Sequence, residues 1–511
     1  MPGIRLSRRS VLAGSAAITS ALAMPAISRA VGRPEMAHGV QSGDVTRDGA
    51  IVWARADRPA RMLAEWATTE SFADATRVQA LPVGEVTDYA GKLALQGLPS
   101  DQDIFYRVTM ADLADGTASE TVIGHFRTAP AGLRDISFVW SGDTAGQGWG
   151  IDEARGGMRT YDTMLRHSPD FLIHSGDTVY ADGPILPEVE LKDGTIWKNV
   201  TIPQKSKVAE TLDEFRKQYL YNMMDKNVRA FNSAVPVLYQ WDDHEVLNNW
   251  YPNEILADDR YTENSVALLS SRAMRAFHEM LPVASTLTEP YRVYRKVAYG
   301  PLLDVFFIDM RTYRGDNTAN DEAQPTSYLG AAQMAWLKRE LAASTATWKV
   351  IASDMPIGMI VRDGEAAFEN SSNGDGPVEG REFDIAEILS FIKHAGVKNI
   401  VWLTADVHYT AAHHYSPERA QFQDFDPFWE FVSGPLHAGT FGPNDYDNTF
   451  GPEVRFAKAP TEEMGVNLPP SDGYQFFGKV DIAADTGLMT VRLMDVADEV
   501  LWSTELAPER A

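Results

Sequence analysis

Four short segments of the chain share one layout, in which an apolar run of strand character ends in a carboxylate. They span residues 136–143, 171–177, 235–244 and 401–408. In open sheet enzymes, ligands bind in the crevice beyond the carboxyl ends of the strands. Aspartate, histidine and tyrosine side chains that converge there are typical metal ligands, so the layout predicts a metal centre at the edge of a sheet.

The side chains at these strand ends suit a centre of two metal ions. The candidates are Asp143, Asp177, Tyr180, Asp243, His244, Asp406 and His408. Two ions can lower the pKa of a bound water and clamp the attacking and leaving oxygens of a displacement at phosphorus. One carboxylate must bridge the ions, and Asp177 follows the most central-looking strand. The Tyr180 phenol must lose its proton to bind, which favours a hard trivalent ion such as Fe(III).

Composition narrows the possible chemistry. The 511 residues include no cysteine, which excludes disulfides, thiolate zinc sites and cysteine nucleophiles and leaves oxygen and nitrogen as metal ligands. The formal net charge is −25, and no basic patch stands out, so we expect no nucleic-acid-binding surface. With 44% hydrophobic residues, a chain of this length can build a large core and more than one domain.

Residues 1–30 have the pattern of an export signal. Arg8 and Arg9 precede a mildly apolar run at 10–23, and residues 28–30 fit a small-x-small cleavage site. A twin arginine in this setting predicts a Tat signal peptide, with a Sec signal or an amphipathic start as the alternatives. No other segment carries the ~20 apolar residues of a transmembrane helix. We therefore expect no membrane span in the mature chain, the Tat machinery as a partner, and a periplasmic or extracellular location.

The rest of the chain divides into two patterns. Residues 33–130 read as short strands separated by turn residues, which predicts a small β-sandwich domain. Residues 133–511 alternate strands with helices, which predicts an α/β domain with helices on the outside. The expected helices lie at 157–167, 211–230, 330–343 and 383–395, and the tail at 478–506 reads as strands. Long loops at 181–205, 362–380 and 437–474 are expected to line a site or to move.

Six ordered motifs give the chain a family resemblance. They are His38-Gly-Val-Gln-Ser-Gly-Asp44, Asp177-Thr-Val-Tyr180, Trp241-Asp-Asp-His-Glu-Val-x-Asn-Asn249, Asp309-Met-Arg-x-Tyr-Arg314, Leu329-Gly-x-x-Gln-x-x-Trp-Leu337 and Asp406-Val-His408. Over residues 36–450 the chain resembles the PhoD-type alkaline phosphatases and phosphodiesterases of the metallophosphoesterase superfamily. The resemblance implies an immunoglobulin-like β-sandwich followed by a two-sheet αββα core. It also implies Tat export and a centre of Fe(III) and Ca²⁺.

Asp143 departs from the family pattern. In the iron-containing members a cysteine stands at this strand end, whereas this chain has a carboxylate. Ordinary metallophosphoesterases also place an aspartate here, so the site can still be built. Loss of the soft thiolate shifts the preference toward harder ions. Fe(III) and Ca²⁺ lead because Tyr180 is present, with Mn, Mg or Zn as the alternatives.

The resemblance also implies roles for individual residues. Asp243 would bind the second metal, with Asn248 as a further ligand or amide contact. His244 would contact the phosphoryl group or protonate the leaving alkoxide. Arg311 would bind a phosphate oxygen, or else form a structural ion pair. For four residues we expect no part in catalysis or metal binding. Asp242 is expected to have a structural role and His174 to lie in the core. His413 and His414 are expected to lie in a solvated loop.

The sequence therefore predicts an exported metal-dependent phosphatase or phosphodiesterase. Metal-activated water would attack phosphorus directly, without a covalent phosphoenzyme, in small-molecule or lipid phosphoesters. One alternative is a phospholipase D-like or phosphotriesterase-like specificity on the same centre, because aromatic residues in the long loops suit a lipid or nucleobase. Another is a non-catalytic protein that binds cell wall or carbohydrate.

Overall fold

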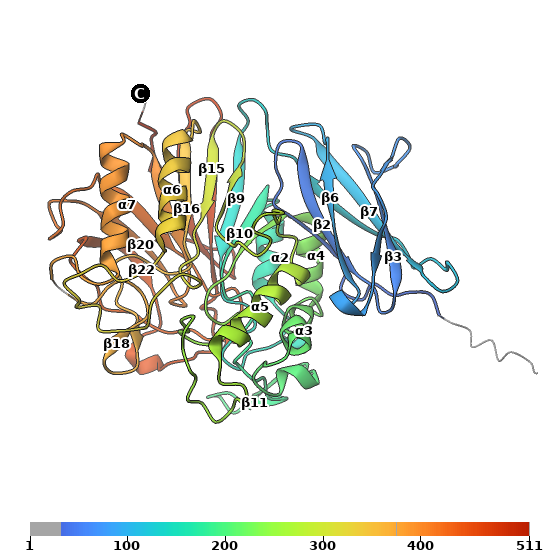
Figure 1. Ribbon diagram of the computed structural model, residues 1–511, viewed down its shortest axis with the longest axis horizontal. Helices are drawn as coiled ribbons and strands as arrows, with labels where there is room; N and C mark the ends of the chain where they lie inside the picture. The colour runs from blue at the N-terminus through green and yellow to red at the C-terminus, as the bar shows by residue number, and fades with distance from the viewer. Residues whose placement is uncertain (1–31, 375, 510–511) are drawn as a thin grey trace, which may run out of the picture.

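The N-terminal part of the chain forms two antiparallel sheets that enclose one apolar core. The computed structural model describes residues 32–374 and 376–509, so the expected export signal at 1–30 lies outside the described residues (Figure 1). One sheet contains β1 (Val40–Gly43), β2 (Gly49–Arg55) and β6 (Ala90–Gln96). The other contains β3 (Ala60–Ala67), β4 (Thr76–Arg77), β5 (Leu81–Val83), β7 (Asp103–Asp112) and β8 (Val122–Arg127). Strand β7 alternates buried and more exposed residues, because one face covers the core and the other meets solvent.

Two larger sheets make up the centre of the rest of the chain. The six-stranded sheet has the order β13 (Val237–Gln240), β10 (Phe171–Ser175), β9 (Ile136–Ser141), β23 (Phe476–Ile482), β24 (Met489–Asp495) and β25 (Val500–Leu506). The seven-stranded sheet has the order β14 (Arg295–Ala298), β15 (Leu303–Phe307), β16 (Trp348–Ala352), β19 (Ile400–Thr404), β21 (Phe428–Val432), β20 (Thr410–Tyr415) and β22 (Pro452–Lys458).

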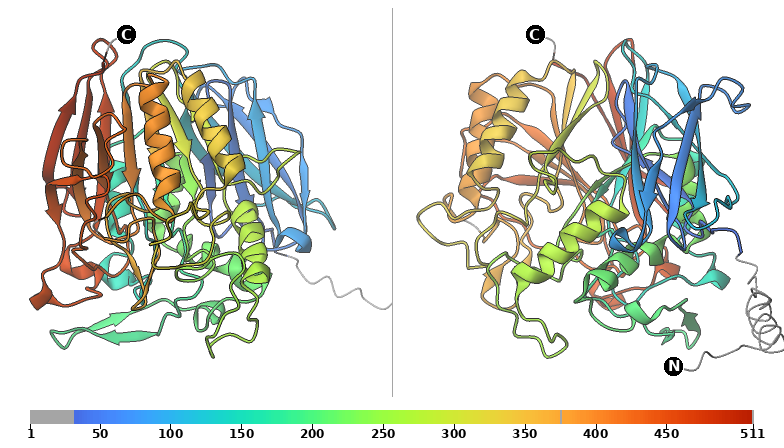
Figure 2. Two further views of the ribbon diagram at one scale, coloured as in Figure 1. Left: turned by 60° about the vertical axis from the view of Figure 1, so that its left-hand side comes forward. Right: turned by 45° about the vertical axis from the view of Figure 1, so that its right-hand side comes forward.

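These sheets pack face to face between two layers of helices. Apolar side chains from both sheets, among them Trp140, Ile173, Val305 and Phe431, form one buried cluster. Helices α2 (Arg159–Arg166), α3 (Leu212–Asn222), α4 (Lys226–Ala234) and α5 (Val266–Met280) cover the outer face of the six-stranded sheet. Helices α6 (Ala331–Ala343) and α7 (Glu382–His394) cover the seven-stranded sheet. Figures 1 and 2 show this αββα order, which confirms the predicted fold class.

The parallel strands bring their carboxyl ends to one edge of each sheet. In the six-stranded sheet β9, β10 and β13 run parallel, and in the seven-stranded sheet β15, β16 and β19 do. An aspartate stands two residues beyond the end of each of these strands: Asp143, Asp177, Asp242, Asp309, Asp354 and Asp406. The fold therefore gathers a set of carboxylates along one side of the double sheet.

Three segments differ in detail from the sequence-based expectation. The helix expected at 211–230 is two helices, and Asp225 starts the second by accepting hydrogen bonds from the amides of Asn227 and Val228. The loop at 181–205 contains a hairpin of β11 (Glu188–Glu190) and β12 (Ile196–Lys198). The loop at 362–380 contains another, β17 (Arg362–Asp363) and β18 (Ala367–Phe368). Short pairings of this kind leave little period-two signal in the sequence.

The β-sandwich packs beside the β13 edge of the six-stranded sheet and against α4 and α5 (Figures 1 and 2). Gln41 donates a hydrogen bond to the carbonyl of Met280, and Arg295 pairs with Asp44 at 2.7 Å. These contacts join the sandwich to the end of α5 and to β14. Every helix in the described part of the chain is too short or too polar to cross a membrane.

Candidate metal centre

A cavity of about 410 Å³ lies where the carboxyl ends of both sheets meet. Asp177, Asp243 and His244 line it from the six-stranded sheet, and Asp406 and His408 line it from the seven-stranded sheet. Its remaining lining residues are Gln147, Asn248, Asn249, Val361, Arg362, Asp363, Gly364, Glu369, Val407, Phe441 and Asn444. The candidate residues therefore come together although they are spread over more than 200 positions of sequence.

The backbone at the site turns sharply at the end of its strands. Asp143, Asp177 and Asp406 have φ values of 67°, 50° and 68°, and His408 has a φ of 60°. Residues other than glycine avoid this left-handed region, and such conformations gather at functional sites where the surrounding fold holds them. The side chains of these residues meet in donor groups beyond the strand ends.

Two glycines make room for the ligand side chains. A Cβ atom on Gly434 would collide with the Asp143 carboxylate, and one on Gly146 would collide with the Tyr180 ring. Both neighbours are fully buried and cannot move aside. These positions therefore need glycine because the backbone passes directly against a candidate ligand.

The first group of donors consists of Asp143, Asp177 and His408, whose ligand atoms lie within 4.8 Å of one another. His408 donates from Nδ1 to the carbonyl of Gly439, which leaves Nε2 facing the group. The Tyr180 hydroxyl lies 2.8 Å from this Nε2. Both carboxylate oxygens of Asp143 are buried without a hydrogen-bond partner. Buried charges without partners are costly, so these atoms fit a bound cation.

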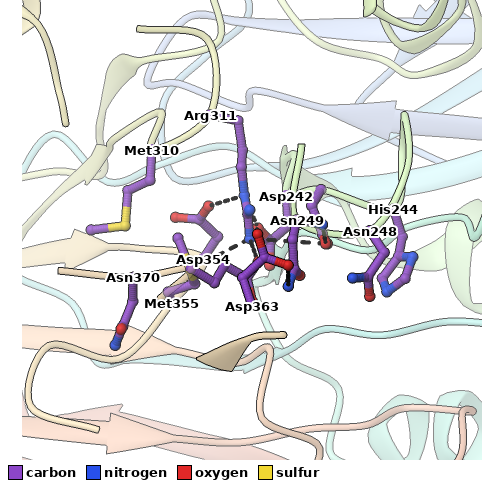
Figure 3. Close-up of polar contacts among 12 residues, drawn as sticks. Asp242, His244, Asn248, Asn249, Met310, Arg311, Asp354, Met355, Asp363 and Asn370 are labelled. Atoms are coloured by element: carbon purple, nitrogen blue, oxygen red, sulfur yellow. Dashed lines mark hydrogen bonds and ion pairs between the residues drawn. The ribbon is translucent and has the colours of Figure 1, made fainter. Parts of the chain in front are cut away.

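The second group is Asp177, Asp243 and His244, again within 4.8 Å. The His244 Nδ1 lies 2.7 Å from Asp182, whose other oxygen accepts the amide of Asn248 at 2.9 Å. Asp177 belongs to both groups, which is the placement expected of a bridging carboxylate. Asn248 lines the cavity, beside His244 in Figure 3.

The third group is Asp242, Asp243, Glu369 and Asp406. The fully buried Arg311 lies against it, donating to Asp242 at 2.6 Å and to Glu369 (Figure 3). Arg311 does not line the cavity. The expected contact of Arg311 with phosphate is therefore not supported, because its guanidinium is engaged by carboxylates behind the cavity. The placement matches the alternative of a structural ion pair.

The protonation of these groups follows from their burial. Burial and the Asp242 carboxylate raise the pKa of Asp143, and burial and Asp243 raise that of Asp177. Burial also raises the pKa of Asp406 and of Tyr180, and it lowers that of His408 to about 4. Burial lowers the pKa of His244 as well, but the carboxylates of Asp182 and Asp243 outweigh it and raise that pKa to about 10. A bound cation favours the deprotonated form of each carboxylate and phenol.

Three residues at the site were not predicted from the sequence to have a role there. Glu245 accepts the amides of Asp177, Thr178 and Asp242, so it holds two of the strand-end turns together. Asp182 orients His244, and Glu369 joins the third donor group. Asp182 could have been found from its position two residues after Tyr180. Glu369 follows a two-residue strand in a long loop and carries no periodic signal.

Four further histidines and acids carried sequence-based expectations, and of these only Asp242 belongs to a donor group. His174 is buried next to Thr144 and Thr178, as its position on β10 predicts. Asp242 pairs with Arg311, which matches the expected structural role. The expectation of a solvated loop for His413 and His414 is wrong: both lie on β20, and His413 is fully buried against Glu430.

The two-sheet fold with clustered carboxylate, imidazole and phenol donors defines the class of metal-dependent phosphoric ester hydrolases. The chain belongs to the PhoD-like phosphatase family. The family model, "PhoD-like phosphatase", matches residues 138–493, and the model for its N-terminal domain matches residues 20–130. Membership in this family makes the chain a phosphoric ester hydrolase.

The chain is also similar to one curated relative and to two solved structures. Alkaline phosphatase D of Bacillus subtilis (strain 168) is 27% identical over 431 residues, which cover 79% of this chain and 70% of the relative. A structure of PhoD has a TM-score of 0.68 at 22% identity and covers 93% of this chain and 90% of its own. Purple acid phosphatase PPD1 from yellow lupin (Lupinus luteus) seeds has a TM-score of 0.55 at 11% identity and covers 93% and 74%. At these identities the two structures bear on the fold alone.

Proposed function

We propose that this enzyme is exported and hydrolyses phosphate monoesters, diesters or both by direct attack of water on phosphorus. The observation that carries the proposal is the position of Asp177, whose carboxylate belongs to two groups of donors at once. A shared carboxylate between two sites is the arrangement that a two-metal hydrolase requires. The metal ions would supply Lewis-acid charge and acidify a bound water.

The donor groups suggest which residues would hold the ions. Asp143, Asp177, Tyr180 and His408 would hold one ion, and Asp177, Asp243, Asp406 and Asn248 would hold the other. Oxygen and imidazole donors without thiolate fit hard or borderline cations. Fe(III) and Ca²⁺ are the proposed pair, and Mn, Mg and Zn are the alternatives because Asp143 is a carboxylate.

His244 is the proposed proton donor to the leaving oxygen. Its ring lines the cavity, and Asp182 holds Nδ1. The ring nitrogen left for the substrate is therefore Nε2. The adjacent Tyr180 ring, 4.3 Å away between centroids, fixes the imidazole plane further. In this role His244 would contact the phosphoryl group and give a proton to the departing alkoxide.

Two features support water as the nucleophile and a small ester as the substrate. No serine, threonine or cysteine occurs among the described residues that line the cavity, so a covalent phosphoenzyme has no evident acceptor there. Phe441 is the one phenylalanine, tyrosine or tryptophan in that lining. Trp149 and Trp250, which the lipid or nucleobase alternative invoked, are 6% and 1% exposed. The phospholipase D-like alternative therefore loses the support of these two of its aromatic residues, and family membership opposes the non-catalytic alternative.

The proposal includes two domains and an export signal. The continuous core of the sandwich supports a domain at 33–130, and the αββα layers support a catalytic domain at 133–511. The twin arginine supports a Tat signal at 1–30 and a periplasmic or extracellular enzyme. Fractionation of cells that express the wild type and the Arg8→Lys, Arg9→Lys variant tests export, since the variant should stay in the cytoplasm.

The decisive experiment measures kcat/KM for p-nitrophenyl phosphate and bis-p-nitrophenyl phosphate before and after chelation. Activity that disappears with chelator and returns with one of the proposed metals supports the proposal. Activity that chelation leaves untouched would contradict it. Elemental analysis of the protein as purified identifies the resident ions.

A further inference from the structure

Arg362 is the one lysine or arginine among the described residues that line the cavity. Five of the other lining residues are acids: Asp177, Asp243, Asp363, Glu369 and Asp406. A phosphoester is an anion, and the acidic walls disfavour its entry unless cations offset them. Arg362 is a permanent cation that belongs to the protein itself, so its position at this wall calls for an explanation.

The hairpin that carries Arg362 is braced against the site. Arg362 pairs with Phe368 across β17 and β18, and its guanidinium carbon lies 5.3 Å from the centre of the Phe368 ring. The next residue, Asp363, accepts the side-chain amide of Asn249 at 3.1 Å (Figure 3) and that of Asn317 at 2.7 Å. The backbone amide of Asn249 in turn donates to Asp243 at 2.6 Å. Arg362 therefore stands on a support tied directly to a candidate metal ligand.

The neighbouring acids are already engaged elsewhere. Asp363 holds the two asparagines, and Glu369 accepts from the buried Arg311. Within the described residues, no carboxylate lies within ion-pair distance of Arg362, although the chain forms many such pairs elsewhere. The side chain is exposed at the cavity wall, with its charge free for a ligand.

We propose that Arg362 binds a terminal oxygen of the phosphoryl group and makes phosphomonoesters the preferred substrate class. This inference rests on the proposed function. A monoester dianion has three terminal oxygens and a charge near −2, whereas a diester has two and a charge of −1. The guanidinium would donate to the third terminal oxygen, and charge-assisted hydrogen bonds of this kind are the strong ones. A second ester group would take the place of the oxygen that Arg362 holds.

The test compares the metal-loaded wild type with Arg362→Gln and Arg362→Lys on both p-nitrophenyl esters. We expect Arg362→Gln to lower kcat/KM for the monoester about 10- to 100-fold, the effect of one charged hydrogen bond. The diester should lose no more than about threefold, since it lacks the third terminal oxygen. Arg362→Lys keeps the charge but loses the guanidinium fork. Its kcat/KM for the monoester should therefore lie between those of the wild type and Arg362→Gln.

Arg339→Gln is the matched control, since it removes the same charge from an exposed side chain on α6 that does not line the cavity. It should leave both substrates unchanged. Equal losses on monoester and diester in Arg362→Gln, or no loss on the monoester, would overturn the inference.

A binding measurement separates this inference from the proposed function. Calorimetry measures the affinity of the metal-loaded protein for inorganic phosphate. This affinity shows whether Arg362 binds phosphate even if neither ester is hydrolysed. Phosphate should bind the wild type more tightly than Arg362→Gln by about tenfold or more. Equal affinities would overturn the role of Arg362, whereas inactivity of the wild type on both esters would overturn the proposed function alone.

Discussion

The two central sheets deliver aspartates by the same local device but use them differently. In the six-stranded sheet, Asp143 and Asp177 join the donor groups, and Asp243 stands beside the strand-end Asp242. In the seven-stranded sheet, only Asp406 of its three strand-end aspartates does so, while Asp309 and Asp354 lie elsewhere. A position two residues beyond a strand is therefore not enough to make a ligand.

The difference lies in backbone conformation and in local partners. Asp143, Asp177 and Asp406 adopt left-handed φ values, whereas Asp309 does not. Asp309 accepts hydrogen bonds from the amides of Arg311 and Thr312, the Thr312 hydroxyl and the indole of Trp241. A carboxylate with its own donors organises the loop that follows it. Both oxygens of Asp143 lack a hydrogen-bond donor, so this carboxylate is left for a cation.

Among the tests of this difference between the two sheets, removal of the metals should have the largest effect on activity and stability. We expect chelation to abolish activity and to lower Tm, because the clustered carboxylates lose the cations that offset their repulsion. Calorimetric scans and assays of the chelated and reloaded protein check both effects. A chelated protein with unchanged Tm and activity would show that the clustered acids are structural, like Asp309.

The next largest effect should come from Asp177→Asn. Asparagine tolerates the left-handed backbone, so the fold should persist, but the shared negative charge is lost. We expect kcat/KM to fall roughly 10³-fold and the metal content to drop. Elemental analysis and steady-state kinetics give the two readouts. If the variant keeps full metal content and full activity, Asp177 does not bridge two metal ions.

Asp309→Ala should show the opposite profile. Its loss leaves several buried donors unsatisfied, so unfolding free energy should fall by about 2–3 kcal/mol. The activity of the folded protein should stay within about threefold, because Asp309 does not line the cavity. Denaturant titration and assays under native conditions separate stability from activity. A large loss of activity without loss of stability would show that Asp309 serves catalysis, like the aspartates in the donor groups.

The smallest expected effect concerns Glu382, a buried acid at the start of α7 over the seven-stranded sheet. Burial and then the Asp447 carboxylate raise its pKa to about 9. Its folded pKa lies above the unfolded value of about 4.3, so the stability it contributes declines as pH rises from about 4.3 to about 9. Glu382→Gln should remove this decline and gain about 1–3 °C in Tm relative to wild type near pH 9. Equal Tm differences at pH 5 and pH 9 would contradict the assignment.

The sequence supported the prediction of the architecture and the gathering of aspartates, because both depend on local patterns. Apolar runs that end in carboxylates occur at β9, β10 and β19, and parallel strands must place those ends together. Asp309 and Asp354 follow their strands in the same way, and nothing in the neighbouring sequence shows that they stay outside the donor groups. Arg311, Asp182 and Glu369 acquire their roles from contacts across 58 to 69 positions of sequence, which no periodicity records.

The central place of β9 has a consequence for how the chain folds. One side of β9 pairs with β10, but its other side pairs with β23, and Ser141 donates to the carbonyl of Phe476 across 335 positions. Until the ribosome has released residues 476–482, the strand that carries Asp143 keeps an open hydrogen-bonding edge. Such long-range pairing slows folding and exposes the edge to wrong partners. Assembly of the six-stranded sheet therefore waits for residues 476–482, which are synthesised more than 300 positions after β9.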